Sequence, residues 1–202
     1  MSERGGGTAR EAAPRHNEDA FFITFQEAIN EDTVKSMIIL VKNVVDQVKP
    51  SQICILFSSS GGSVNAGITL HNFLRAVPAE IVFHNIGAVD SIATAVFLAG
   101  RRRYACANAR FLFHGVTYTP PPGEALTQRQ LKEFLSVVQQ CEAASGKVVT
   151  DNTSIGRDEV LALFDQGETK DAAYALEKGI IHGICDAVIP PGSKHHVFVT
   201  PK

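Results

Sequence analysis

In each of two stretches of this sequence, an apolar run leads into a helix start built from small residues. The first is Ile53-Cys54-Ile55-Leu56-Phe57 leading into Ser59-Ser60-Gly61-Gly62-Ser63-Val64-Asn65-Ala66-Gly67. The second is Ile81-Val82-Phe83 leading into Gly87-Ala88-Val89-Asp90-Ser91-Ile92-Ala93. A glycine pair after a strand lets backbone N–H groups approach a ligand with no Cβ in the way. A serine at a helix start lies where unpaired N–H groups and the helix dipole favour negative charge.

Strand-like and helical segments alternate around these stretches. Strand-like runs cover residues 21–25, 53–57, 81–85, 103–106, 110–114 and 184–189. Helical apolar spacing covers residues 32–48, 64–76, 91–100, 127–149, 157–165 and 172–178. The alternation predicts an α/β fold with a mostly parallel sheet covered by helices. Functional groups collect at the carboxyl ends of such strands, where the glycine pair, Ser91 and His114 all stand.

Composition narrows the class of protein. The 202 residues are 45% hydrophobic and 20% charged with a formal net charge of −2, which is ordinary for a globular chain with one substantial core. The sequence has no basic patch with interleaved aromatic residues, which a nucleic-acid partner would favour. It also has no apolar stretch near the roughly 20 residues that span a bilayer. We therefore expect neither nucleic acid nor a membrane as a partner.

The two ends of the chain are expected to lie outside the domain. Residues 1–19 read as a disordered leader, because residues 1–17 are rich in Gly, Arg and Ala and lack the apolar core of a secretory signal. Residues 20–190 are expected to form a single domain, and residues 191–202 a polar tail. A bacterial-type cytoplasm is the expected location.

The cysteines and histidines form no metal motif. Cys54, Cys106, Cys141 and Cys185 are widely separated without a CxxC pair, which excludes the common zinc spacings and argues against a disulfide framework. No His-Glu-x-x-His or similar spacing occurs. The sequence predicts no metal site.

An acyl-transfer site needs a nucleophile, a base and an oxyanion hole. Ser91 is a candidate nucleophile and His114 a candidate base, since a serine hydroxyl needs a base and histidine titrates in the right range. The two are 23 positions apart in the sequence. Their strand ends converge if the strands are neighbours in the sheet. The backbone N–H groups of Gly62 and Ile92 are then the candidate oxyanion donors.

Each of these features also has an ordinary structural explanation. A serine at a helix start is usually an N-cap, a histidine ending an apolar strand is often a hydrogen-bonded core residue, and a glycine pair mostly marks a turn. Triads are recognised by geometry rather than by local sequence. Only the ordered set favours catalysis.

The ordered set resembles the proteolytic subunit of the Clp protease, ClpP. The family order is SxGGxVxAG, GxxxS, a helix ending in Ala-Gly, and NxRxxxH, which here covers Ser59 to Gly67, Gly87 to Ser91, Ala99-Gly100 and Asn108 to His114. The resemblance extends over residues 20–189. It implies a ClpP/crotonase-like α/β spiral of strand-strand-helix units, in which a helix at about 127–150 protrudes as the handle.

The resemblance also implies an activity. A Clp-type serine endopeptidase hydrolyses peptide bonds through an acyl-enzyme, with Ser91 as nucleophile, His114 as base, and Gly62 and Ile92 as oxyanion donors. Its substrate would be a peptide or an unfolded protein. Hydrolysis itself requires no cofactor.

The third member of the family's triad is an aspartate that orients the base. An ungapped match puts Gly167 at that position. Glu168 takes the role if one residue is deleted, and Asp165 takes it if the loop is redrawn. We assign Glu168 as the third catalytic residue and keep Asp165 as its rival.

The resemblance further implies self-association into a homo-oligomer, expected to be a ring. Residues 165–171 contain no clear match to the acidic–basic pair that couples ring stacking to activity, so one ring, two rings, a trimer or a hexamer all stay open. The N-terminal segment does not resemble the family's axial loops. Docking to an unfoldase ATPase is therefore unsupported by the sequence.

Two departures near the candidate site keep other functions open. Ser60 stands where the family usually has proline, and Asp90 where it usually has a small residue. One alternative is a catalytically degenerate ClpP-like subunit that assembles or binds peptides. An acyl-CoA enzyme of the crotonase type ranks below it, because such enzymes usually rely on glutamates. A Ser–Lys dyad using Lys147 or Lys170 is made unnecessary by His114.

Overall fold

The sheet is organised around its longest strand, β3. The computed structural model describes residues 16–120, 123 and 125–199, so most of the expected leader lies outside the described residues. In this part of the chain the sheet order is β6-β5-β3-β2-β1-β8, with β4 pairing both β3 and β7. The strands are β1 (Phe21–Gln26), β2 (Gln52–Ser59), β3 (Glu80–Asp90), β4 (Arg102–Ala105), β5 (Arg110–Leu112), β6 (Thr169–Asp171), β7 (Gly183–Ile184) and β8 (Lys194–Val197).

One edge of β3 is shared between two partner strands. Its middle residues, Val82 to Asn85, pair in parallel with β4. Its last three residues, Ala88 to Asp90, pair in parallel with β5. Because β4 ends before β5 begins, the fork carries β5 and the residues that follow it to the carboxyl end of β3.

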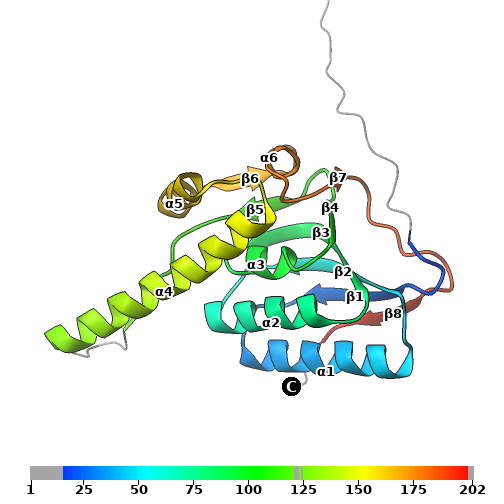
Figure 1. Cartoon of the computed structure of the whole chain (residues 1–202), viewed down its shortest axis with the longest axis horizontal. Coiled ribbons are helices and arrows are strands. Elements are labelled where there is room, and N and C mark those ends of the chain that lie inside the picture. The colour runs from blue at the N-terminus through cyan, green and yellow to red at the C-terminus, as the bar shows by residue number, and fades with distance from the viewer. Residues whose placement is uncertain (1–15, 121–122, 124, 200–202) are drawn as a thin grey trace, which may run out of the picture.

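Some helices cover one face of the sheet, others lie beside β5 and β6, and one helix projects outward (Figure 1). They are α1 (Glu31–Gln47), α2 (Val64–Ala76), α3 (Ala93–Phe97), α4 (Gln128–Asn152), α5 (Arg157–Gln166) and α6 (Ala172–Glu177). Helix α1 begins with a capping box, in which the Asn30 side chain accepts from the Thr33 N–H and the Thr33 hydroxyl accepts from the Asn30 N–H. Its buried side chains recur at helical spacing and pack on the sheet, and include Val34, Met37, Val41 and Val44.

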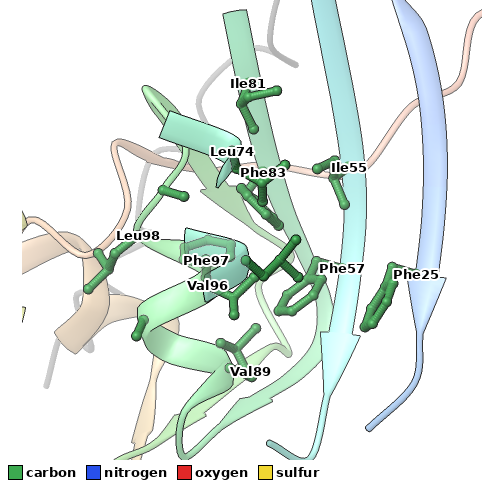
Figure 2. Packing of buried hydrophobic residues seen from close by; sticks show 14 of the residues in the cluster. Phe25, Ile55, Phe57, Leu74, Ile81, Phe83, Val89, Val96, Phe97 and Leu98 are labelled. Carbon is green, nitrogen blue, oxygen red and sulfur yellow. The ribbon is translucent and has the colours of Figure 1, made fainter. Parts of the chain in front are cut away.

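A chain of phenylalanine rings runs through the core between the sheet and α3. Phe25 stacks on Phe57, which contacts Phe83; Phe83 contacts Phe97, and Phe97 contacts Phe111, with ring centroids 5.1–5.5 Å apart. Figure 2 shows the first four of these rings along β1, β2, β3 and α3. All five are at most 1% exposed. Truncating one of them to alanine would cost about 3–5 kcal/mol, so this row holds the strands that carry the site in fixed positions.

Helix α4 extends away from the sheet (Figure 1), and several apolar side chains near its far end are exposed. Val149 is its one fully buried residue. Leu131, Leu135 and Val137 are 54–57% exposed. A surface helix with uncovered leucines commonly marks an interaction face.

The near end of α4 is fastened to the body by a buried arginine. The Arg103 guanidinium donates to the carbonyl oxygens of Gly100, Asn152, Gly179 and Ile180 at 2.7–3.0 Å. Burial lowers the pKa of Arg103 to about 10, which leaves it charged at neutral pH. These bonds fix the exit of α4 relative to α6 and the β3–β4 connection.

The α/β fold with a protruding helix is confirmed, and the differences are local. Helix α3 starts at Ala93, two residues later than expected, because Ser91 has a left-handed backbone with φ of 58°. Of the expected strand at 184–189, only Ile184 belongs to a strand. Within the expected polar tail, Lys194–Val197 instead joins the sheet beside β1, and Phe198 packs on Phe25. All four β8 side chains are exposed, so backbone pairing rather than apolar patterning makes this strand.

Candidate active site

Ser91 occupies a sharp turn between β3 and α3. Its φ of 58° is uncommon for a residue with a side chain and costs roughly 1–2 kcal/mol. Its N–H donates to the carbonyl of Leu112 at 2.8 Å, and its carbonyl accepts from both the N–H and the hydroxyl of Thr94. These three bonds hold the turn, and the Ser91 side chain stays partly exposed.

His114 reaches the same place from β5. Because Asp90 pairs with Leu112, the next residues of both strands emerge at one edge of the sheet. Ser91 and His114 line two adjoining cavities together. Nδ1 of His114 lies 2.7 Å from the carbonyl oxygen of Gly115, and since a carbonyl only accepts, Nδ1 carries the proton. In the neutral imidazole this arrangement leaves Nε2 as the nitrogen that can accept a proton.

The backbone pairing around the two candidate oxyanion donors leaves their N–H groups free. The Ile29 N–H donates to the Gly61 carbonyl at 2.8 Å, and the Ser63 N–H donates to the Ile29 carbonyl at 2.7 Å. This parallel bridge skips the N–H of Gly62. Among the described residues, neither that N–H nor the N–H of Ile92 has an acceptor. A pair of unpaired N–H groups near a serine is what an oxyanion hole requires.

The glycine pair is packed too tightly for any side chain. A Cβ on Gly62 would lie 2.2 Å from the Ile29 carbonyl oxygen. A Cβ on Gly61 would lie 2.7 Å from the Cβ of Ser91. Their φ values, 144° and 85°, also favour glycine. Gly62 is therefore required by the close approach of the loop to Ile29, and Gly61 by its close approach to the Ser91 turn.

Comparison with known proteins decides the family. A family model described as Clp protease matches residues 16–188. The chain belongs to the Clp protease family. The ClpP/crotonase-like fold that the resemblance implied is thereby confirmed.

Named relatives of this Clp protease family member are distant. The ATP-dependent Clp protease proteolytic subunit 1 of Leifsonia xyli subsp. xyli is 26% identical over 139 residues, 68% of this chain and 68% of that protein. The proteolytic subunit 2 of Treponema pallidum is 23% identical over 189 residues, 88% of this chain and 92% of that protein. Identity this low makes the chain a divergent member.

The Clp protease triad is incomplete in the described part of this chain. Glu168 is 60% exposed and forms an ion pair with Lys170 at 2.7 Å. Asp165 is exposed on α5 and makes no hydrogen bond to His114. The carbonyl of Gly115, not a carboxylate, accepts from Nδ1. No hydrogen bond joins the described Ser91 hydroxyl to the His114 ring.

One acidic residue beside the site was missed by sequence reasoning. Glu142 of α4 accepts from the Val116 N–H at 3.0 Å, and its Oε1 would lie 3.0 Å from a Cβ on Gly115. It therefore holds the segment whose Gly115 carbonyl orients His114. A glutamate on a polar helix carries no local signal of this role, because its partner lies 26 residues away in the sequence.

A groove leads past the site between two stretches of backbone. Its volume is about 250 Å³. One wall is residues 62–65, the other is residues 116–118, and Val137, Val138 and Cys141 of α4 close it. Residues 116–118 belong to no helix or strand, so their backbone groups can pair with an extended peptide in the groove.

The described residues offer neither a candidate metal site nor a helix that could span a membrane. They contain no cluster of three or more His, Cys, Asp or Glu side chains suited to a metal ion. None of the described helices is long and apolar enough to cross a membrane.

Proposed function

We propose that this chain is a serine peptidase that hydrolyses peptide bonds through an acyl-enzyme, acting on peptides or unfolded proteins. The observation that carries the proposal is the meeting of Ser91, His114 and two free backbone N–H groups at one edge of the sheet. Membership of the Clp protease family supports the same reaction class.

The proposed reaction begins when an extended peptide enters the groove. Nε2 of His114 takes the proton from Ser91 Oγ, and Oγ attacks the scissile carbonyl carbon. The N–H groups of Gly62 and Ile92 donate to the resulting oxyanion. His114 then returns the proton to the leaving amine, the C–N bond breaks, and an acyl ester stays on Ser91. Water, deprotonated by His114, releases the acid and restores the serine.

In the proposed mechanism a backbone carbonyl, that of Gly115, orients His114 in place of the usual carboxylate. The Gly115 carbonyl fixes the tautomer of His114, as a carboxylate would. A neutral carbonyl stabilises the imidazolium less than a charged carboxylate does. We expect slow turnover relative to a full triad.

A catalytically degenerate subunit is the second candidate function. It is favoured by the exposed Glu168, which pairs with Lys170 instead of His114. Such a subunit would assemble or bind peptides in the groove without cleaving them.

Labelling with a fluorophosphonate distinguishes the two functions. Adduct located on Ser91 by peptide mass spectrometry, and lost in Ser91→Ala and His114→Ala, is expected for the peptidase. Ser145→Ala is the matched control, because Ser145 lines the adjoining cavity but donates its hydroxyl to the Cys141 carbonyl. Absence of adduct on folded protein would leave only the degenerate subunit.

A further inference from the structure

A second cavity lies at the carboxyl ends of β1, β2 and β3, apart from the Ser91 groove. Its volume is about 310 Å³, and Ser91 and His114 are not among its lining residues. Side chains alternate between the faces of a strand, so Asp90 points away from the core that contains Val89. The cavity is therefore on the face of the sheet opposite α1, α2 and α3.

Asp90 brings an unsatisfied carboxylate to this cavity. Its side chain is 9% exposed, and Oδ2 accepts from Nη2 of Arg110 at 3.0 Å. Oδ1 is buried and has no hydrogen-bond partner among the described residues. A buried acceptor left without a donor is costly, more so when it carries charge. Arg110 alone does not use the hydrogen-bonding capacity of this carboxylate.

The rest of the lining is rich in acceptors. Glu27 is half-buried and forms no ion pair with a described residue. Ser58, Ser59 and Ser60 also line the cavity, and the hydroxyl of Ser58 accepts from the Ala88 N–H at 3.2 Å. Two carboxylates face one guanidinium, that of Arg110, so the cavity attracts positive charge.

The lining suits an organic cation better than a metal ion. Hard divalent cations take six or more oxygen ligands, and this cavity offers two carboxylates with Arg110 bound to one of them. An ammonium or guanidinium head instead donates several directed hydrogen bonds to carboxylate and hydroxyl oxygens.

We propose that the cavity binds the ammonium or guanidinium head of a small organic cation, with Asp90 and Glu27 as its acceptors. Oδ1 of Asp90 turns toward the cavity when the cation binds. Arg110 permits this turn because it is 57% exposed and held to Asp90 by one hydrogen bond. The assignment does not depend on the proposed hydrolysis.

Calorimetric titration of the full chain with agmatine and methylguanidine tests the proposal, with N-methylurea as the neutral control. We expect both cations to bind and N-methylurea not to bind. Loss of one charge-assisted hydrogen bond should weaken binding about tenfold or more in Asp90→Asn and in Glu27→Gln. Glu18→Gln, an exposed carboxylate outside the cavity, should bind like the wild type.

The result that overturns the proposal is equally direct. Cations that bind no better than N-methylurea, or that bind equally well to the wild type and both cavity variants, exclude the site. If Asp90→Asn fails to fold, the comparison of Glu27→Gln with the wild type is sufficient to test the proposal. Light scattering shows whether the bound cation is a free small molecule or a side chain of a second copy of this protein. A molar mass that falls on adding agmatine, and is low in Asp90→Asn, would show that a second copy of the chain fills the cavity instead.

Discussion

Gly167 lies directly beside His114: a Cβ on Gly167 would stand 3.9 Å from the Cβ of His114. Gly167 ends α5 with a left-handed φ of 62°. It is also the position that the ungapped resemblance gives to the family's triad aspartate. Gly167 therefore has no side chain with which to orient His114, and the Gly115 carbonyl accepts from Nδ1 instead.

Gly167→Asp should accelerate the modification of Ser91 by a fluorophosphonate. Aspartate is one of the residues that tolerate a left-handed backbone, and its charge would stabilise the imidazolium of His114. We expect an increase of about tenfold or more in the second-order labelling rate. Gly167→Asn, similar in shape but uncharged, is the control; equal acceleration by asparagine would rule out the electrostatic explanation.

Glu142→Ala should slow Ser91 labelling by about tenfold, because it leaves the Val116 N–H without its acceptor and loosens the Gly115 carbonyl. Glu142→Gln keeps a carbonyl oxygen in place and should lose less. Glu133→Gln on the exposed part of α4 is the matched control and should have no effect. A rate unchanged in Glu142→Ala would show that α4 does not position the base.

Gly62→Ala should destabilise the fold and abolish labelling. The added Cβ would lie 2.2 Å from the Ile29 carbonyl oxygen, so the loop must shift away from Ile29 and carry the Gly62 N–H out of its place. We expect a loss of about 2 kcal/mol or more in the free energy of unfolding in urea. At Gly156 a Cβ would meet nothing within 4 Å, and Gly156→Ala should lose less than about 1 kcal/mol. Similar losses in the two variants would contradict the packing argument.

Leu135→Glu should lower the molar mass measured by light scattering. We infer that the exposed apolar side chains of α4 associate with other copies of the chain, since Leu135 is 57% exposed on a helix that projects from the body. The neighbouring exposed Lys132→Glu is the control for added charge. A wild-type chain that is monomeric at every concentration would refute this inference.

Acid should destabilise the protein through His84. Burial lowers the pKa of His84 from 6.5 to about 4, so the unfolded chain binds more protons between these values. The stabilisation is complete above about pH 6.5 and is lost as the pH falls toward about 4. The loss is on the order of 3 kcal/mol. Urea unfolding across this range should show a shallower pH dependence in His84→Gln, and an equal slope in both proteins would contradict the assignment.

The individual strands and helices of this protein, and two of its candidate site residues, follow from local signals in the amino-acid sequence. The apolar run before the Gly61-Gly62 pair predicted β2, and helical spacing predicted α2 with its bounds at residues 64–76. Both signals depend on residues close together in the chain, where hydrophobic period and turn chemistry act directly. The same local signals, in order, singled out Ser91 and His114.

The way in which these strands and helices come together depends on three-dimensional packing. The fork of β3 between β4 and β5 brings Ser91 beside His114, and no residue near either one specifies that pairing. Antiparallel pairing of β6 with β5, together with the bond from the Gly115 N–H to the Phe164 carbonyl, puts Gly167 beside His114. The burial of Asp90, with Oδ1 left without a hydrogen-bond partner among the described residues, is likewise visible only in the folded sheet. Long-range contacts are set by the joint packing of whole strands and helices, so the completeness of the site is decided there.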